Sequence, residues 1–137
     1  MLLARLMWRA EAPAKAILFG EHAVLYGAPA IAIAIDIRAS VSMENSNVWL
    51  LNGEEFNPLE NPHLSHLISE FSSFEKPLSV SIESAIPIAA GLGSSAALSV
   101  ASGMVLSAAK NSDLIASTET LARAAHRAEA SAQGGRA

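Results

Sequence analysis

The sequence contains no cysteine, and this absence excludes a disulfide framework and any chemistry that depends on a thiolate. It is also poor in charged residues, at 16%, and in aromatic residues, at 5%. The hydrophobic fraction of 51% is typical of a compact domain and not of a disordered chain. With 137 residues, the chain is long enough for one domain with a core and too short for two of ordinary size. Because it lacks cysteine, we expect a protein of a reducing, cytoplasmic compartment.

Long hydrophobic runs and an excess of positive charge are missing as well. The net charge of −4 provides no general attraction to nucleic acid or to anionic lipid. Arg5 and Arg9 interrupt the apolar start of the chain, so we expect no secretion signal. The most apolar run, residues 96–109, is shorter than a bilayer requires and contains three serines. We therefore expect a soluble protein with neither a membrane nor a nucleic acid as its partner.

Residue periodicity predicts strands in the first part of the chain. Isoleucines alternate with smaller or polar residues over residues 31–37, and residues 78–82 alternate in the same way, which is typical of strands with one apolar face. The pair Asn52-Gly53 lies between two short runs and predicts a tight hairpin turn.

Helices are predicted mainly in the second part of the chain. Helical spacing of apolar residues indicates a helix within residues 60–74, and residues 94–110 form a predicted helix that is apolar almost all round and must therefore be buried. Gly103 lies inside this helix, and we expect it to allow close packing against a neighbour. Ser117 is the expected N-cap of a last helix, with Glu119 in its first turn. Strands followed by helices indicate an α+β fold.

A glycine-rich stretch, PIAAGLGSSAAL, connects a predicted strand to the predicted helix over residues 94–110. Free backbone N–H groups and the positive end of the helix dipole meet at such a junction, and Gly91 and Gly93 let the main chain close around an anion. Ser94 and Ser95 add hydroxyls, one to cap the helix and the other to face a phosphate or its magnesium ion. The lysine of a Walker A loop and the third glycine of a dinucleotide fingerprint are both absent. A plain connecting turn is the alternative.

The run P-x-x-x-G-L-G-S-S-A in this stretch resembles the phosphate-binding motif of the GHMP kinases, the superfamily of galactokinase, homoserine kinase, mevalonate kinase and phosphomevalonate kinase. Residues 12–36, APAKAILFGEHAVLYGAPAIAIAID, are similar to the N-terminal signature of the mevalonate kinases within it. The resemblance implies the N-terminal domain of the GHMP kinase fold, a mixed, mostly antiparallel sheet with helices on one face. It also implies ATP-dependent phosphorylation of the primary hydroxyl of mevalonate, for isoprenoid precursor synthesis, with this chain carrying the ATP-binding part.

The resemblance assigns roles to individual residues. Lys15 matches the active-site lysine, whose ammonium would favour the alkoxide of the substrate and neutralise charge on the transferred group. Glu21 and His22 match an element beside the mevalonate site. Ser95 and Glu129 match the two ligands of Mg²⁺, which is the cofactor together with ATP. The residues matching the loop around the ATP phosphates are Pro87, Ile88, Ala89, Ala90, Gly91, Leu92, Gly93, Ser94, Ser95 and Ala96.

Each assigned residue also has a structural alternative. Lys15 could be a solvated lysine at a strand edge, and His22 could be a satisfied structural histidine. Glu129 could be an exposed helix glutamate that pairs with Arg123 or Arg127. Ser94 is a better candidate for the helix N-cap than Ser95 is.

The match to the family is incomplete. The catalytic aspartate and the C-terminal domain of the family are absent, so we expect residues 1–137 to form an incomplete N-terminal domain with negligible turnover alone. Ala14 replaces the usual glycine before Lys15, and Gly134-Gly135 adds one glycine to the usual spacing. Three alternatives remain open: a phosphomevalonate kinase, a homoserine kinase, and a non-catalytic nucleotide-binding fragment. An apolar surface left exposed would drive pairing in a homodimer or with a partner chain.

Overall fold

The computed structural model describes residues 7–20, 22–87, 91–110 and 115–133. Its strands are β1 (Met7–Phe19), β2 (Ile31–Asn45), β3 (Leu50–Leu51), β4 (Glu54–Glu55) and β5 (Leu78–Ser84). Its α-helices are α1 (Pro62–Phe71), α2 (Ser94–Lys110) and α3 (Thr118–Ala132), and its short 3₁₀ helices are η1 (Ala23–Tyr26) and η2 (Pro58–Glu60). The predicted α+β class is confirmed. Within the described residues, no helix is long and apolar enough to cross a membrane.

The strands form one mixed sheet in the order β1-β2-β5-β3-β4. All neighbouring pairs are antiparallel except β3 and β5, which run parallel, so the expected mostly antiparallel sheet is confirmed. The predicted hairpin turn joins β3 to β4, where Asn52 and Gly53 adopt φ angles of 50° and 86°. These positive angles are the reason for an Asn-Gly pair here, since other residues rarely adopt them.

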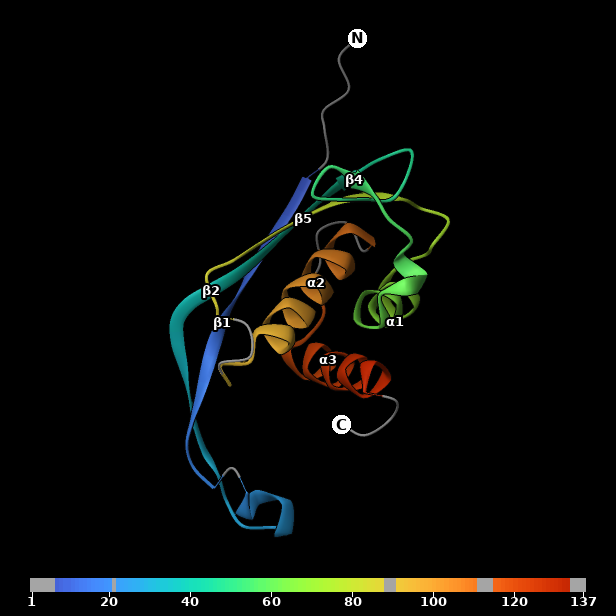
Figure 1. Ribbon diagram of the computed structural model, residues 1–137. Helices are drawn as coiled ribbons and strands as arrows, with labels where there is room; N and C mark the ends of the chain where they lie inside the picture. Colours follow the sequence, from blue (N-terminus) through green and yellow to red (C-terminus); the bar gives the residue numbers. More distant parts are fainter. Residues whose placement is uncertain (1–6, 21, 88–90, 111–114, 134–137) are drawn as a thin grey trace.

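The three α-helices cover one face of the sheet, as Figure 1 shows. Helix α2 lies against β1 and β2, and α1 and α3 pack against α2 and against each other. The strand residues in this core include the small side chains of Ala12, Ala14 and Ala39, each 4% exposed or less. Small side chains let a helix approach the sheet closely. The start of α2 is thereby brought next to β1, the strand that carries Lys15.

Two local predictions about the helices are confirmed. A Cβ placed on Gly103 would lie 3.2 Å from Leu121 Cδ2 and 3.4 Å from Phe71 Cε2, so this glycine does allow α1 and α3 to pack closely on α2. The hydroxyl of Ser117 accepts a hydrogen bond from the backbone N–H of Thr120 at 3.2 Å, as expected of an N-cap.

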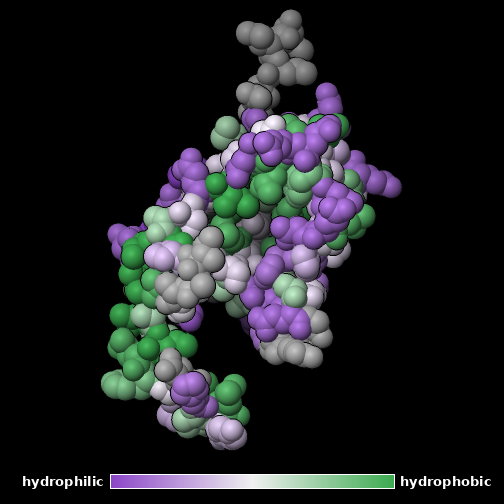
Figure 2. Space-filling view, in the orientation of Figure 1, coloured by the Kyte–Doolittle hydropathy of each residue, from purple (hydrophilic) through white to green (hydrophobic). Residues whose placement is uncertain are grey.

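The hairpin of β1 and β2 continues past the helices as an apolar arm (residues 17–20 and 22–33) that ends in η1 (Figure 1). The alternation in β2 correctly predicts a strand, but its large side chains are not covered there: Ile31 is 51% exposed and Ile33 is 46% exposed. Farther along the arm, Leu25 is 78% exposed and Tyr26 is 89% exposed. Figure 2 shows this apolar surface at the lower left of the molecule. The helices reach only the other half of the hairpin, so nothing in the described residues buries the arm.

Candidate functional site

Lys15 joins β1 to the glycine-rich stretch, although 76 residues separate Lys15 from Gly91. β1 is an edge strand, and the backbone N–H of Lys15 donates to the carbonyl oxygen of Leu92 at 2.9 Å across its open edge. The ammonium Nζ donates to the carbonyl oxygen of Gly91 at 3.2 Å. Lys15 thus lies at a strand edge, and both its main chain and its side chain contact the loop.

The pairing of β1 with β2 is irregular beside Lys15. The pairing of β1 with β2 shifts register between Pro13 and Ala14, since Pro13 lies opposite Arg38 while Ala14 lies opposite Ile35. Such irregularities bend a strand and redirect its side chains, and they are common beside functional sites. Ala14, which replaces the usual glycine of the resembled family, is fully buried here. The register shift thus lies directly before Ala14, the residue that precedes Lys15.

Both glycines of the loop adopt backbone angles that other residues rarely take. Gly91 has a φ of +73° and Gly93 a φ of +75°. A Cβ on Gly93 would lie 3.0 Å from Cγ and 3.1 Å from Cε of Lys15, whereas a Cβ on Gly91 would meet nothing within 4 Å. Gly93 is thus needed for two reasons, the turn of the chain and the close approach of the lysine stem.

Helix α2 begins immediately after these glycines. The backbone N–H of Ala97 donates to the carbonyl oxygen of Gly93 at 2.9 Å, so Gly93 is the residue before the first turn. The assignment of Ser94 as the N-cap is therefore wrong, because Ser94 and Ser95 are the first two residues of the helix itself. Their amide groups are among those that have no partner within a helix, and they point toward its N-terminal end. This geometry favours an anion.

A cavity of about 120 Å³ opens beside Ser95, between α1, α2 and the strands β3 and β5. Its apolar walls are Leu51, Leu64, Leu67, Ile82 and Leu98, and its polar groups are Asn61, His63, Ser95, Ser99 and Ser102. The three serines come from one face of α2. Ser99 is only 3% exposed, and its hydroxyl has no hydrogen-bond partner among the described residues. A buried polar group without a partner is a candidate contact for a ligand.

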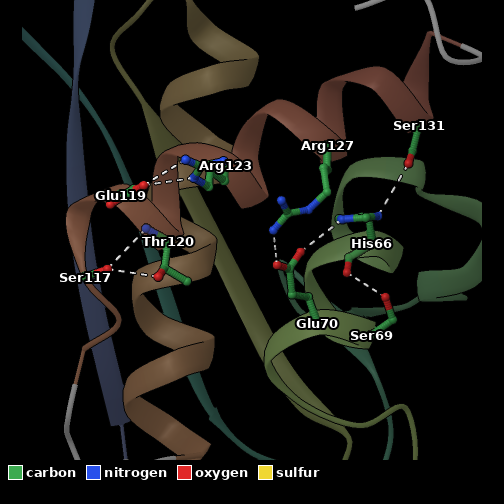
Figure 3. Close-up of polar contacts among 9 residues, drawn as sticks. All are labelled: His66, Ser69, Glu70, Ser117, Glu119, Thr120, Arg123, Arg127 and Ser131. Atoms are coloured by element: carbon green, nitrogen blue, oxygen red, sulfur yellow. Dashed lines mark hydrogen bonds and ion pairs between the residues drawn. The ribbon is translucent and has the colours of Figure 1, made fainter.

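Glu129 contacts a histidine of another helix and neither of the arginines considered above. Its Oε1 lies 3.1 Å from Nε2 of His63, and its side chain is 20% exposed. Arg123 pairs instead with Glu119, and Arg127 pairs with Glu70 (Figure 3). The alternative in which Glu129 is an exposed partner of Arg123 or Arg127 is therefore wrong.

One oxygen of the Glu129 carboxylate is available to a cation such as Mg²⁺. Oε1 of Glu129 is buried and has no hydrogen-bond partner in the described part of the chain. His63, which Glu129 contacts, lines the same cavity as Ser95. No cluster of three His, Cys, Asp or Glu side chains that could hold a metal occurs within the described ranges. Mg²⁺ needs no such cluster, because it takes one or two carboxylates together with phosphate oxygens and waters.

The remaining predicted residues are less informative. His22 directly precedes η1 at the end of the apolar arm, and its side chain is exposed. Pro87 and Ala96 are exposed on either side of the loop. Glu21, Ile88, Ala89 and Ala90 lie outside the described residues. The roles assigned to these seven residues therefore stay predictions.

Sequence reasoning missed His63, Ser99 and Ser102. The two serines left a signal, because together with Ser95 they recur at helical spacing in an otherwise apolar helix. His63 left none, since its partner Glu129 lies 66 positions farther along the chain.

Comparison with known proteins identifies the family. Residues 62–137 match the family described as "GHMP kinases N terminal domain". Because this match covers more than half of the sequence, the chain belongs to the GHMP kinases.

Within this family, the chain is similar to mevalonate kinases. It is 36% identical to that of Pyrococcus abyssi over 156 residues, covering 91% of this chain and 45% of the relative. It is 43% identical to that of Methanothermobacter thermautotrophicus over 133 residues, covering 91% and 43%. The crystal structure of the Methanococcus jannaschii mevalonate kinase matches with a TM-score of 0.77 and 28% identity, covering 96% of this chain and 48% of that one. The chain thus spans about half the length of these relatives and matches their N-terminal part.

The two loop glycines provide a test of the contact between Lys15 and the glycine-rich loop. Replacing either glycine by alanine forces a left-handed conformation on a residue with a Cβ, at about 1–2 kcal/mol. Gly93→Ala also brings the new methyl group within 3.0 Å of the stem of Lys15, which must then shift away from the loop. We expect Gly93→Ala to lower the free energy of unfolding, measured by urea denaturation, by more than the matched control Gly91→Ala does. Equal losses would show that Lys15 does not pack on Gly93.

Proposed function

We propose that this chain is the ATP-binding part of a mevalonate kinase, the enzyme that transfers the γ-phosphoryl group of ATP to the primary hydroxyl of mevalonate. In this proposal, residues 1–137 form the N-terminal, nucleotide-binding domain. The observation that carries it is the contact of Lys15 with Gly91, Leu92 and Gly93 at the start of α2. This contact places a cation beside a helix N-terminus, where the phosphates of a nucleotide are stabilised.

Each part of the loop then has a task in phosphoryl transfer. The transfer depends mainly on positioning and on neutralising the charge of the phosphates. The amides of Ser94 and Ser95 bind phosphate oxygens, and the ammonium of Lys15 exchanges its bond to the Gly91 carbonyl for one to the transferred group. The hydroxyl of Ser95 and the carboxylate of Glu129 are the residues that would hold Mg²⁺, which would neutralise the phosphate charge.

The cavity beside Ser95 is suited to the base of the nucleotide. Most of its lining is apolar, and Ser99 and Asn61 offer polar contacts to the edge of a flat ring. Sites for small molecules commonly combine apolar walls with a few polar groups in this way. A triphosphate at the start of α2 and a base in the adjacent cavity would belong to one ligand.

Mevalonate is favoured over other phosphate acceptors by the similarity to mevalonate kinases of several organisms. A phosphomevalonate kinase or a homoserine kinase of the same family remains the second candidate. No feature of the described residues favours these acceptors.

Removing the lysine ammonium tests nucleotide binding. Lys15→Met preserves most of the stem and removes the charge, so we expect the Kd of Mg·ATP for the 137-residue chain, measured by calorimetry, to rise about 10-fold or more. Lys76→Met is the control, because Lys76 is exposed and lies outside the loop. Unchanged affinity in Lys15→Met, or an equal loss in both variants, would contradict the proposal.

We also propose that the apolar arm is an association surface, as an exposed patch of this kind suggests. Its most exposed side chains are Leu25, Tyr26 and Phe19, the last of which is 66% exposed. In the isolated chain, the available apolar partner is the same arm of a second copy. A non-catalytic fragment that needs a partner chain would use the same surface.

Light scattering tests this association. We expect the isolated chain to have a mass above the 14.3 kDa of one copy, and Leu25→Glu to shift it toward that value because a charge in the apolar contact is costly. Leu59→Glu is the matched control, since Leu59 is 64% exposed but lies in η2, outside the arm. A monomeric parent chain, or an equal effect of both substitutions, would contradict the role of the arm.

A further inference from the structure

The side chains of His63 and Glu129 lie in contact, but each has a buried polar atom that forms no hydrogen bond. Nε2 of His63 and Oε1 of Glu129 are 3.1 Å apart, and both atoms are shielded from solvent. The groups are nevertheless not aligned as a hydrogen bond, and neither atom has another partner among the described residues. Leaving a buried polar group without a partner is unfavourable. A ligand that supplies the missing partner would remove this penalty.

A second histidine–glutamate pair, formed within α1, shows the contrast (Figure 3). His66 and Glu70 also lie 3.1 Å apart, but these two side chains form a hydrogen bond. Arg127 pairs with the other oxygen of Glu70, and the hydroxyl of Ser131 lies 3.4 Å from Nδ1 of His66. This pair is saturated by protein groups alone, whereas the pair of His63 and Glu129 is not.

The backbone of His63 is fixed by the start of α1. The side chain of Asn61 caps the helix by accepting a hydrogen bond from the N–H of Leu64 at 3.0 Å, and Pro62 is the first helical residue. Both features hold the first turn of a helix in place. From this fixed turn, His63 lines the cavity that Ser95 also lines, and its Nε2 lies beside Glu129.

We propose that His63 is a positioning residue that holds the carboxylate of Glu129 for a divalent cation bound to the nucleotide phosphates. The inference rests on the proposed function, because it takes Glu129 as a ligand of that cation. A free glutamate has several rotamers, and the contact with a fixed imidazole limits them. The cation supplies the partner that the buried carboxylate oxygen lacks. Partners that orient a ligand in this way typically change metal affinity 10- to 100-fold.

The experiment compares two dissociation constants for each variant of the 137-residue chain. Calorimetry gives the Kd of ATP in EDTA and the Kd of Mn·ATP. The first value divided by the second measures how much the cation strengthens binding. We expect His63→Phe to lower this ratio about 10-fold while the Kd of ATP in EDTA stays unchanged. His63→Gln keeps an N–H donor on the side chain, and we expect it to restore most of the ratio.

His66→Phe is the matched control, because it replaces a histidine of the same helix that pairs with a glutamate outside the cavity. We expect it to retain the parental ratio, and thermal melts of all variants report on folding. A parental ratio in His63→Phe, an equal loss in His66→Phe, or no recovery in His63→Gln would overturn the inference alone. A parent chain that binds neither ATP nor Mn·ATP would contradict the proposed function, and the inference with it.

Discussion

The rest of the site depends on one contact, the closure of the glycine-rich loop onto the open edge of β1. The N–H of Lys15 bonds to Leu92, its ammonium bonds to Gly91, and its stem packs on Gly93. Main-chain and side-chain bonds of one residue thereby fix three consecutive loop residues. An edge strand normally leaves such groups unpaired. Here the unpaired edge provides the anchor that brings a cation to the N-terminus of α2.

The packing beneath this contact explains why it forms. Alanines in β1 and β2 let α2 lie close to the sheet, and Gly103 lets α1 and α3 close over α2. This arrangement brings separate segments around one cavity: the first part of α2, the start of α1, and the strands β3 and β5. The last turn of α3 joins them through the contact of Glu129 with His63. The proposed nucleotide site combines a glycine-rich loop, a cation and an adjacent apolar cavity, and the chain belongs to the GHMP kinases.

Local features could be predicted from the sequence, because they depend on neighbouring residues. The bounds of α2, the N-cap Ser117 and the Asn52-Gly53 turn follow from helical spacing, capping and positive φ angles. Features that depend on distant segments could not be predicted. The contact of His63 with Glu129 and the register shift before Lys15 arise only when helices and strands pack. The exposed isoleucines of the arm show the same limit, since alternation predicts a strand but not whether another element covers it.

The account predicts that backbone amides at the start of α2 hold the phosphates of ATP. Amide chemical shifts of the ¹⁵N-labelled chain, followed during titration with Mg·ATP, measure this directly. The predicted result is that the largest shifts occur at Gly93, Ser94 and Ser95, with Lys15 following at the same concentrations. Saturable shifts confined to other parts of the sheet, with these amides unchanged, would contradict the account.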